Sequence, residues 1–153
     1  MSRASEKEMK GRRPSALTAA IQNTVASAHT LLYRATGGLI GGRVLNSPVL
    51  LLTTTGRKTG KKRTVPLLYL ADKETVVLVA SNGGAVKDPT WWLNLKSNPE
   101  AEVQINGRRR RVRARQASAE EKRRLWPRLT QMYPGYQKYQ DKTDRDIPLV
   151  ILQ

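Results

Sequence analysis

The dipeptide Asn106-Gly107 restricts the fold of this chain more than any other feature of its sequence. Asn-Gly is the preferred pair for a two-residue type I′ turn, because both positions of that turn need a positive φ angle. The turn separates two strand-like runs, residues 100–105 and 108–115. Counting outward from it pairs residues across a hairpin, opposite charges included: Ile105 with Arg108, Glu102 with Arg111, and Glu100 with Arg113. The sequence therefore predicts an antiparallel hairpin in this part of the chain.

Other runs rich in leucine and β-branched residues predict strands at 48–55, 64–70, 75–80 and 147–152. The first three follow one another across short polar connections, which favours an antiparallel meander. Short helices are predicted after Asp88, taken as an N-cap with Pro89 in the first turn, and after Ser118, which forms a capping box with Glu121. Because strands and helices do not alternate as βαβ units, the predicted fold class is α+β: an antiparallel barrel with a few short helices.

The N-terminal region is predicted to lie outside this barrel. Residues 1–13 are charged and have no periodic apolar positions, so we expect a disordered basic tail. Residues 14–38 are predicted to form an amphipathic helix, whose apolar positions recur at spacings of three or four: Leu17, Ile21, Val25, Ala28 and Leu32. Polar residues among them argue against a transmembrane span. Residues 39–153 then form the barrel domain.

Charge and composition restrict the function. The chain has 28 Lys and Arg against 12 Asp and Glu, a formal charge of +16. An anionic partner is therefore expected, whether nucleic acid, a membrane surface or a phosphorylated small molecule. With no cysteine and with His29 as the only histidine, the sequence offers no thiol nucleophile, catalytic triad or metal site. A bound cofactor is expected to supply any redox reactivity, and the lack of cysteine fits a cytoplasmic location.

Residues 56–63 form a loop that combines two glycines with five cations: Arg57, Lys58, Lys61, Lys62 and Arg63. Backbone amides and guanidinium groups in such a loop converge readily on phosphate or carboxylate. The spacing is not that of a P-loop. A solvated hairpin tip is the alternative interpretation.

Two further segments carry residue types that suit a binding site. Ser81-Asn82-Gly83-Gly84 follows a predicted strand, and its glycines allow a planar ligand to approach closely, although ordinary turn chemistry also explains them. Tyr133, Tyr136 and Tyr139 are spaced by three and so share one side of a helical turn. Their phenols serve either as packing groups or as hydrogen-bond donors to a substrate.

Taken together, these segments resemble a known family. The runs that carry the resemblance are LLTTTGRKTGKKRTVPLLYL, ASNGGA, DPTWWLNLKSNPEAEVQI and WPRLTQMYPGYQKYQDKTDRDIPLVIL. In this order they are similar to the deazaflavin-dependent nitroreductases of actinobacteria, also called deazaflavin-dependent quinone reductases, and they extend over roughly residues 40–152. The resemblance implies a split β-barrel like those that bind FMN, here binding coenzyme F420, a 5-deazaflavin with a phosphodiester and an oligoglutamate tail.

The resemblance also implies roles for individual residues. The phosphate and tail of the cofactor are implied to contact the basic loop through Arg57, Lys58, Thr59 and Arg63. The deazaflavin ring is implied to lie against Pro66, Leu67, Ala80, Ser81, Asn82, Gly83 and Gly84, with Trp92 and Asn94 nearby. The acceptor side is implied to be lined by Tyr133, Tyr136 and Tyr139. Leu68 stands where some nitroimidazole-reducing members have a tyrosine, and Asn82 where some have a lysine, so a different range of acceptors is expected.

The activity that the resemblance implies is hydride transfer from C5 of the reduced deazaflavin to a quinone or another electron-poor acceptor, nitro compounds included. The protein then supplies orientation and a proton donor, for which Ser81, Tyr133 and Tyr136 are candidates. An FMN-binding split barrel and a non-enzymatic nucleic-acid-binding barrel are the alternatives. Nucleic acid is not the expected partner, because the arginine strand at 108–115 has no aromatic residue to stack on bases.

The N-terminal region adds one more expectation. An amphipathic helix that follows a basic tail suits the inner face of an anionic membrane, so peripheral membrane contact is expected there. The alternative is that the helix covers the mouth of the barrel.

Overall fold

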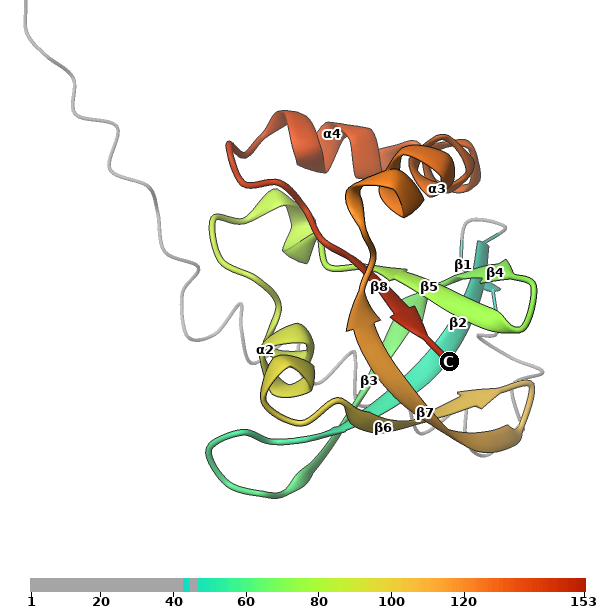
Figure 1. The fold of residues 1–153 in the computed structure, drawn as a ribbon, viewed down its shortest axis with the longest axis vertical. Helices are drawn as coiled ribbons and strands as arrows, with labels where there is room; N and C mark the ends of the chain where they lie inside the picture. Colours follow the sequence, from blue (N-terminus) through green and yellow to red (C-terminus); the bar gives the residue numbers. More distant parts are fainter. Residues whose placement is uncertain (1–42, 45–46) are drawn as a thin grey trace, which may run out of the picture.

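A computed structural model of the chain describes residues 43–44 and 47–153 (Figure 1). The predicted tail 1–13 and helix 14–38 lie outside the described residues, as does the beginning of the predicted barrel domain. The described strands are β1 (Arg43–Val44), β2 (Ser47–Thr55), β3 (Lys62–Leu68), β4 (Leu70–Asp72), β5 (Thr75–Val79), β6 (Glu100–Ile105), β7 (Arg108–Gln116) and β8 (Leu149–Leu152). The described helical segments are η1 (Asn82–Gly84), α2 (Thr90–Ser97), α3 (Ala119–Met132) and α4 (Gly135–Asp141).

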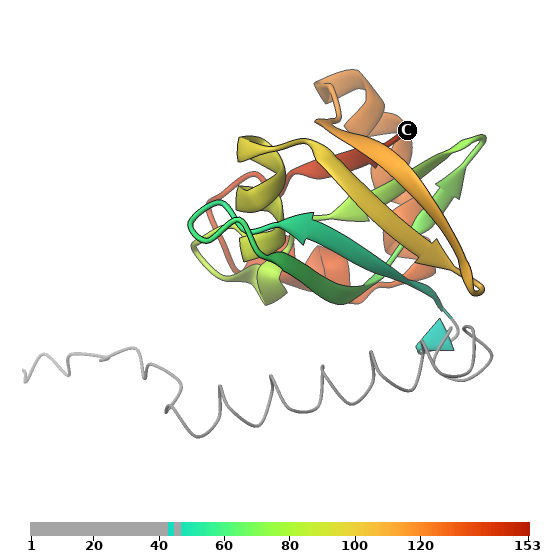
Figure 2. The same cartoon turned by 90° about the horizontal axis from the view of Figure 1, so that it is seen from below.

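The strands form one antiparallel sheet whose two edges are joined by a single residue. Along the sheet the order is β3-β2-β6-β7-β8-β5-β4, and the short β1 pairs with the start of β2. Strand β3 ends at Leu68 and β4 begins at Leu70, so Tyr69 carries the chain from one edge of the sheet to the other. The sheet therefore has to curl, as Figure 2 shows. In the described part of the chain no ladder joins β3 to β4 or β5, so hydrogen bonds do not close the curl.

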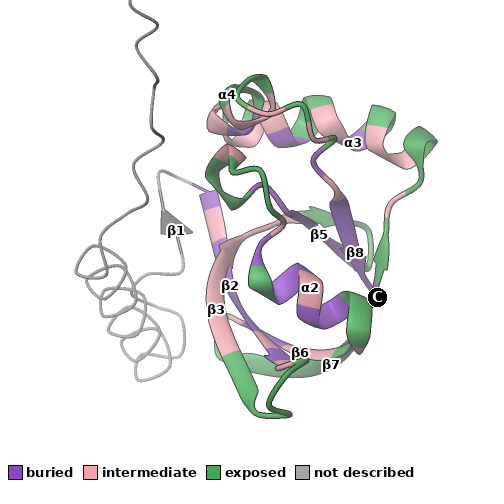
Figure 3. Cartoon of the chain, turned by 90° about the vertical axis from the view of Figure 1, so that its left-hand side faces the viewer, coloured by how far each residue is buried: buried purple, intermediate pink, exposed green. Residues whose placement is uncertain are grey.

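The interior of the curl holds the first hydrophobic core. Helix α2 lies across it (Figure 3) and buries Trp91, Trp92 and Leu95 against the sheet. The sheet contributes side chains from five strands to this cluster: Leu50, Leu52, Val76, Leu78, Val103, Val112, Ala114, Val150 and Leu152. Burying these apolar side chains supplies the main driving force for the curled sheet.

A second core covers the outer face of β5 and β8. Here α3 and α4 pack on the sheet through Leu125, Leu129 and Tyr136. Alternate residues of β5 serve the two cores, since Val76 and Leu78 belong to the first and Val77 and Val79 to the second. The same holds in β8, so both strands are covered on both faces. This explains why their sequences are apolar throughout instead of alternating.

The predicted hairpin is confirmed in its turn and its register. Asn106 and Gly107 have φ angles of 50° and 78°, as a type I′ turn requires. Strands β6 and β7 pair as counted from the sequence, with Ile105 opposite Arg108 and Glu100 opposite Arg113. Arg113 also forms an ion pair with Glu100. The antiparallel α+β class is thus confirmed.

Three local predictions are wrong. The strand expected at 64–70 is broken at Tyr69 into β3 and β4, and the expected meander does not form because β5 pairs with β8 and β4. Asp88 does not cap α2, whose N-cap is Pro89 without a side-chain hydrogen bond. The Asp88 carboxylate instead accepts hydrogen bonds from Lys96 and Arg145, at 3.0 and 2.8 Å.

Helix α3 begins with the predicted capping box. The Ser118 hydroxyl accepts a hydrogen bond from the Glu121 amide at 3.1 Å, and the Glu121 carboxylate accepts one from the Ser118 amide at 3.0 Å. Arg115 donates to both carboxylate oxygens of Glu121, at 2.8 and 2.9 Å. The Arg115 hydrogen bonds, followed by those from Ser118, lower the pKa of Glu121 from 4.5 to about 2.

Replacing Glu121 by Gln is predicted to lower the unfolding free energy at pH 7 by about 1 kcal/mol, the usual contribution of a helix cap or a half-exposed ion pair. The lowered pKa means that the carboxylate stabilises the fold above its unfolded pKa and that this contribution disappears as the pH falls towards 2. Urea denaturation from pH 7 to pH 3 should therefore show wild type and Glu121→Gln converging. Glu120→Gln, a change in the same helical turn, is the control, and a constant difference between wild type and Glu121→Gln across this range would contradict the assignment.

Candidate functional site

A cavity of 560 Å³ lies where β3, the η1 turn and α4 meet. One wall comes from β3 and the end of β5: Val65, Pro66, Leu67, Leu68 and Val79. The η1 turn and the start of α2 contribute Ser81, Asn82, Gly83, Pro89, Thr90 and Trp91. Tyr133, Tyr136 and Tyr139 complete the lining. Two groups of residues predicted from distant parts of the sequence, one for the cofactor ring and one for the acceptor, thus share one cavity.

The wall formed by β3 is apolar, and this strand is an edge of the sheet. Pro66, Leu67 and Leu68 are all half-buried. Proline has no backbone donor and is tolerated on edge strands, where one side of the backbone has no partner strand. An apolar wall of this kind suits the face of a flat aromatic ligand.

The η1 turn brings backbone close to the cavity. Asn82, Gly83 and Gly84 have φ angles of 46°, 63° and 79°. A Cβ atom at Gly84 would lie 2.7 Å from the carbonyl oxygen of Tyr139, so only glycine allows η1 to pack directly on α4. Gly83 lines the cavity, whereas Gly84 sets the contact with α4. Ser81 is 8 % exposed and lies at the cavity, and Ala80 is fully buried behind it.

The three tyrosines form a compact aromatic group. The hydroxyls of Tyr133 and Tyr139 are 3.1 Å apart and share a hydrogen bond. The rings of Tyr133 and Tyr136 pack edge to face with centroids 5.0 Å apart. Burial, and secondly the neighbouring phenols, raise the pKa of Tyr136 well above its usual value, and the hydrogen bond with Tyr133 raises the pKa of Tyr139. Both hydroxyls therefore stay protonated at neutral pH and are available as hydrogen-bond donors.

The basic loop is held in one conformation by the interior of the protein. The buried Asn94 side chain accepts a hydrogen bond from the Arg57 amide at 3.1 Å and donates one to the Thr54 hydroxyl at 3.1 Å. Within the loop, the Gly56 amide donates to the Lys61 carbonyl at 2.8 Å, and the Gly60 amide donates to the Gly56 carbonyl at 2.8 Å. The start of the loop is thus anchored to the interior, and the rest is closed by its own backbone hydrogen bonds.

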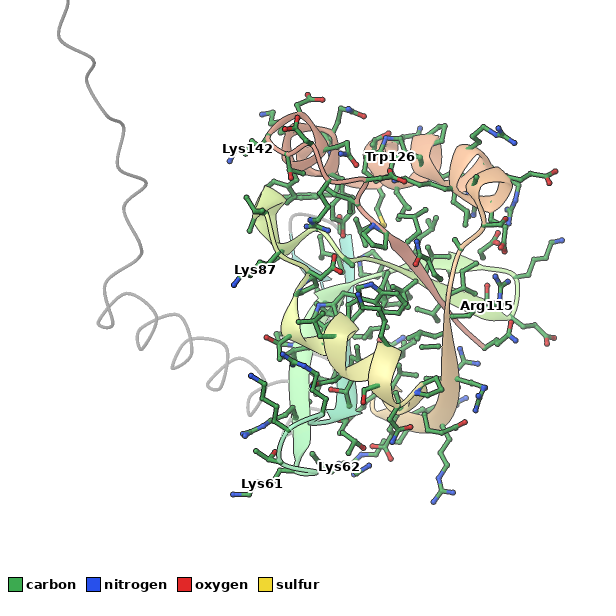
Figure 4. The ribbon with its side chains drawn as sticks, turned by 60° about the vertical axis from the view of Figure 1, so that its left-hand side comes forward. Lys61, Lys62, Lys87, Arg115, Trp126 and Lys142 are labelled. Carbon is green, nitrogen blue, oxygen red and sulfur yellow. The ribbon has the colours of Figure 1, made fainter. Side chains whose placement is uncertain are left out.

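The cations of this loop are exposed to solvent. Arg57, Lys58, Thr59, Lys61 and Arg63 are all exposed, and Figure 4 shows Lys61 and Lys62 at the end of the β2–β3 hairpin, far from α4. No carboxylate in the described part of the chain forms an ion pair with Arg57, Lys58, Lys61 or Arg63. Their positive charge is thus left for an external anion.

Strand β3 connects the loop to the cavity. Arg63 stands near its first residue and Pro66 lies three residues further on, which is about 10 Å along an extended strand. Helix α2 makes the same connection, since Pro89 to Trp91 line the cavity and Asn94 holds the loop. The arrangement fits a ligand with a planar end in the cavity and an anionic extension along β3.

The remaining predicted residues lie in the interior. Trp92 is 4 % exposed and belongs to the first core, whereas its neighbour Trp91 lines the cavity. Sequence reasoning did not select Thr90 or Val79, whose positions depend on how the sheet curls. It also missed Arg145, whose guanidinium bonds to the segment after β5.

Within the described residues, no group of three or more His, Cys, Asp or Glu side chains is placed to hold a metal ion. No described helix is long and apolar enough to cross a membrane.

The apolar cavity and the cationic loop, connected by β3 on a curled antiparallel sheet, together suit a planar ligand with an anionic extension. A model of the F420H(2)-dependent quinone reductase family matches residues 25–153. The chain belongs to this family, whose members are oxidoreductases that use coenzyme F420. This result decides against FMN and against a non-enzymatic nucleic-acid-binding barrel.

Individual relatives agree with the family match. The chain is 40 % identical over 128 residues to an F420H(2)-dependent quinone reductase of Mycobacterium tuberculosis H37Rv, covering 81 % of this chain and 86 % of the relative. A solved F420-H2 dependent reductase is 42 % identical with a TM-score of 0.65, covering 72 % of this chain and 98 % of that one. A second solved structure, described as a domain-swapped dimer, is 37 % identical with a TM-score of 0.67 and covers 90 % of this chain and 100 % of its own.

Proposed function

We propose that the chain reduces a quinone with F420H2 in the 560 Å³ cavity, and that the basic loop binds the anionic tail of the cofactor. The observation that carries this proposal is the shared lining of the cavity. Pro66, Leu67, Ser81 and Gly83, expected to contact the ring, face the same space as the three tyrosines expected to contact the acceptor. Hydride transfer needs the two reactants side by side, and one cavity with two distinct walls provides this.

The fit of the residues to F420 supports the proposal. Arg57, Lys58 and Arg63 are exposed cations, and no described carboxylate forms an ion pair with them. Such cations suit the phosphodiester and the glutamates of the F420 tail, which are anionic. The apolar side chains of β3 suit one face of the ring, and the small Gly83 admits it closely to the backbone. When bound, the reduced deazaflavin supplies the hydride.

The protein's own residues orient the acceptor and stabilise charge on its oxygen. Quinone reduction to quinol takes up one hydride and one proton, so negative charge develops on a quinone oxygen during transfer. The Tyr136 hydroxyl, whose pKa burial raises, stays protonated and donates a hydrogen bond to that oxygen. In the bond between Tyr133 and Tyr139 one hydroxyl donates to the other, which leaves the second hydroxyl hydrogen for the acceptor, and Ser81 supplies a further hydroxyl at the cavity. The apolar β3 wall excludes water from the transfer.

We also propose that the curled sheet is a split β-barrel. The single-residue connection at Tyr69 between the two edge strands supports this, because it holds β3 close to β5 without a ladder between them. An experimental structure with a continuous β3–β5 ladder would rule it out.

Replacing Arg57 and Arg63 together by Gln is predicted to weaken F420 binding by about 3 kcal/mol or more, since a charged hydrogen bond contributes about 1.5–3 kcal/mol. Titration by fluorescence at several salt concentrations should also show a flatter salt dependence in the double variant, because fewer charges face the tail. The matched control is Arg108→Gln with Arg110→Gln, which removes the same charge from the β6–β7 hairpin.

A deazaflavin truncated before its phosphate distinguishes the outcomes of this titration. It should bind wild type and the Arg57/Arg63 variant with equal affinity, because it lacks the anions that the loop binds. If the truncated and full cofactors bind wild type equally well, the loop has no role in tail recognition.

Replacing Tyr136 by Phe is predicted to lower kcat with a quinone by roughly ten- to a thousandfold, because a hydrogen bond to the developing oxyanion is lost. Tyr133→Phe should act in the same direction. The affinity for F420 should change little, since the phenols contact the acceptor and not the tail. Steady-state kinetics and a binding titration measure the two effects. Tyr69→Phe, at a tyrosine that does not line the cavity, is the control, and unaltered turnover in both variants would return Tyr133 and Tyr136 to a packing role.

Peripheral membrane contact through residues 1–35 stays a prediction, motivated by the basic tail and the apolar stripe of the sequence. Full-length chain should sediment with anionic vesicles, and a chain that starts at Gly38 should sediment less. Equal sedimentation of the two would reject the contact.

A further inference from the structure

Arg145 makes more contacts with the η1 region than its position after α4 suggests. Its Nη1 and Nη2 atoms donate hydrogen bonds to the carbonyl oxygens of Ala80 and Ser81, at 3.2 and 2.9 Å. Its Nε atom donates to the carbonyl of Ala85 at 3.2 Å. Asp88 supplies the counter-charge at 2.8 Å, and the Arg145 side chain is only 16 % exposed. One guanidinium thus fixes both ends of the segment 80–88.

The backbone of Arg145 is in turn fixed to α4. The Gln140 side chain donates a hydrogen bond to the Arg145 carbonyl at 2.7 Å and accepts one from the Ile147 amide at 3.0 Å. Gln140 follows Tyr139 directly in the helix that carries the tyrosine wall. Arg145 therefore connects the two walls of the cavity, the 80–88 segment on one side and the tyrosine helix on the other.

The two walls of the cavity pack closely against each other at Gly84. Gly84 lies against the Tyr139 carbonyl, where even a methyl group would collide. Beyond the buried Ala80 and Ser81, the segment is held mainly by hydrogen bonds: the Asn82 side chain donates to the Lys87 carbonyl at 3.0 Å, whereas Val86 is 84 % exposed. A segment with few buried contacts opens easily unless specific hydrogen bonds hold it.

We propose that Arg145 is a positioning residue that sets the distance between Ser81–Gly83 and the tyrosines, and thereby the fit of the deazaflavin ring. The role needs the planar fork of arginine, because three carbonyls and a carboxylate lie around one group, and the single ammonium of lysine does not match them. Lys96 also binds Asp88 but reaches none of the three carbonyls, so it does not replace Arg145. This inference rests on the proposed function of the cavity.

The test compares Arg145→Lys with Arg124→Lys. Arg124 likewise donates two hydrogen bonds to a buried carboxylate, at 3.2 and 2.9 Å, but that carboxylate is Asp72 of β4 and not part of the 80–88 segment. Both variants keep the positive charge and lose the paired hydrogen bonds of a guanidinium group. A loss of overall stability would therefore appear in both variants. The probe is the deazaflavin truncated before its phosphate, which reports on the ring without the basic loop.

Arg145→Lys is expected to weaken binding of the truncated cofactor at least tenfold and to raise KM for the quinone, with Arg124→Lys within twofold of wild type in both. Hydrogen exchange in the cofactor-free protein should speed up at the Gly84 and Ala85 amides, which donate to the Ser81 and Asn82 carbonyls. If Arg145→Lys does not fold, Asp88→Asn removes the counter-charge and is expected to act in the same direction.

Two outcomes overturn the idea. Truncated-cofactor affinity and Gly84 exchange that match wild type would make Arg145 a surface ion-pair residue. Equal losses in Arg145→Lys and Arg124→Lys would make its effect one of general stability. Wild type that binds neither full nor truncated deazaflavin would instead reject the proposed function of the cavity, which keeps the two failures distinct.

Discussion

The one-residue connection at Tyr69 is the constraint on which the rest of the structure depends. It joins the opposite edges of one sheet, and its amide donates a hydrogen bond to the Pro48 carbonyl at 3.1 Å, so the sheet has to curl. Strand β4 pairs only with Thr75 to Val77 of β5, which leaves the last part of β5 without a partner on that side. The cavity lies at this gap, between Val65–Leu68 of β3 and Val79 of β5. A closed barrel would fill the space with a ladder, so the site exists because closure stops there.

Two groups of charged residues differ in their pairing, carboxylates that are paired with arginines and loop cations that have no described carboxylate partner. Arginines neutralise the buried carboxylate of Asp72 and the half-buried carboxylate of Asp88: Arg124 and Arg128 pair with Asp72, and Arg145 pairs with Asp88. The hydrogen bonds from Arg124 and then from Arg128 hold the pKa of Asp72 well below its usual range. No described carboxylate forms an ion pair with a cation of the β2–β3 loop, and the cations there repel one another. Asn94 fixes the first residue of that loop, Arg57, and under the proposed function this preorganises the loop for an anionic ligand.

The sequence predicted the parts of the structure that depend on neighbouring residues. The Asn106-Gly107 turn, the register of its strands and the Ser118–Glu121 capping box each need only a few consecutive residues, and each is confirmed. The family resemblance added the membership that the comparisons then established. It also selected most of the residues that share the cavity.

The parts that the sequence did not predict depend on distant contacts. Nothing local distinguishes Tyr69 from the leucines around it, because the break is set by which strands pair. Asp88 has the residue type and spacing of an N-cap, but Arg145, 57 positions away, binds its carboxylate instead. For the same reason Arg145 was indistinguishable from other charged residues near the C-terminus. Its role is visible only where the curl brings η1 against α4.

The chemistry available in the cavity also follows from its construction. Burial of Tyr136 in the second core, and secondly the neighbouring phenols, make ionisation of its hydroxyl costly. Tyr136 is therefore held neutral, suited to donating a hydrogen bond and unsuited to acting as a base. The described residues that line the cavity include no charged side chain and no histidine, so under the proposed function neutral hydroxyls are the groups that stabilise charge on an acceptor oxygen. Hydride transfer needs this combination, because its electron pair comes from the cofactor and the protein contributes orientation and hydrogen bonds.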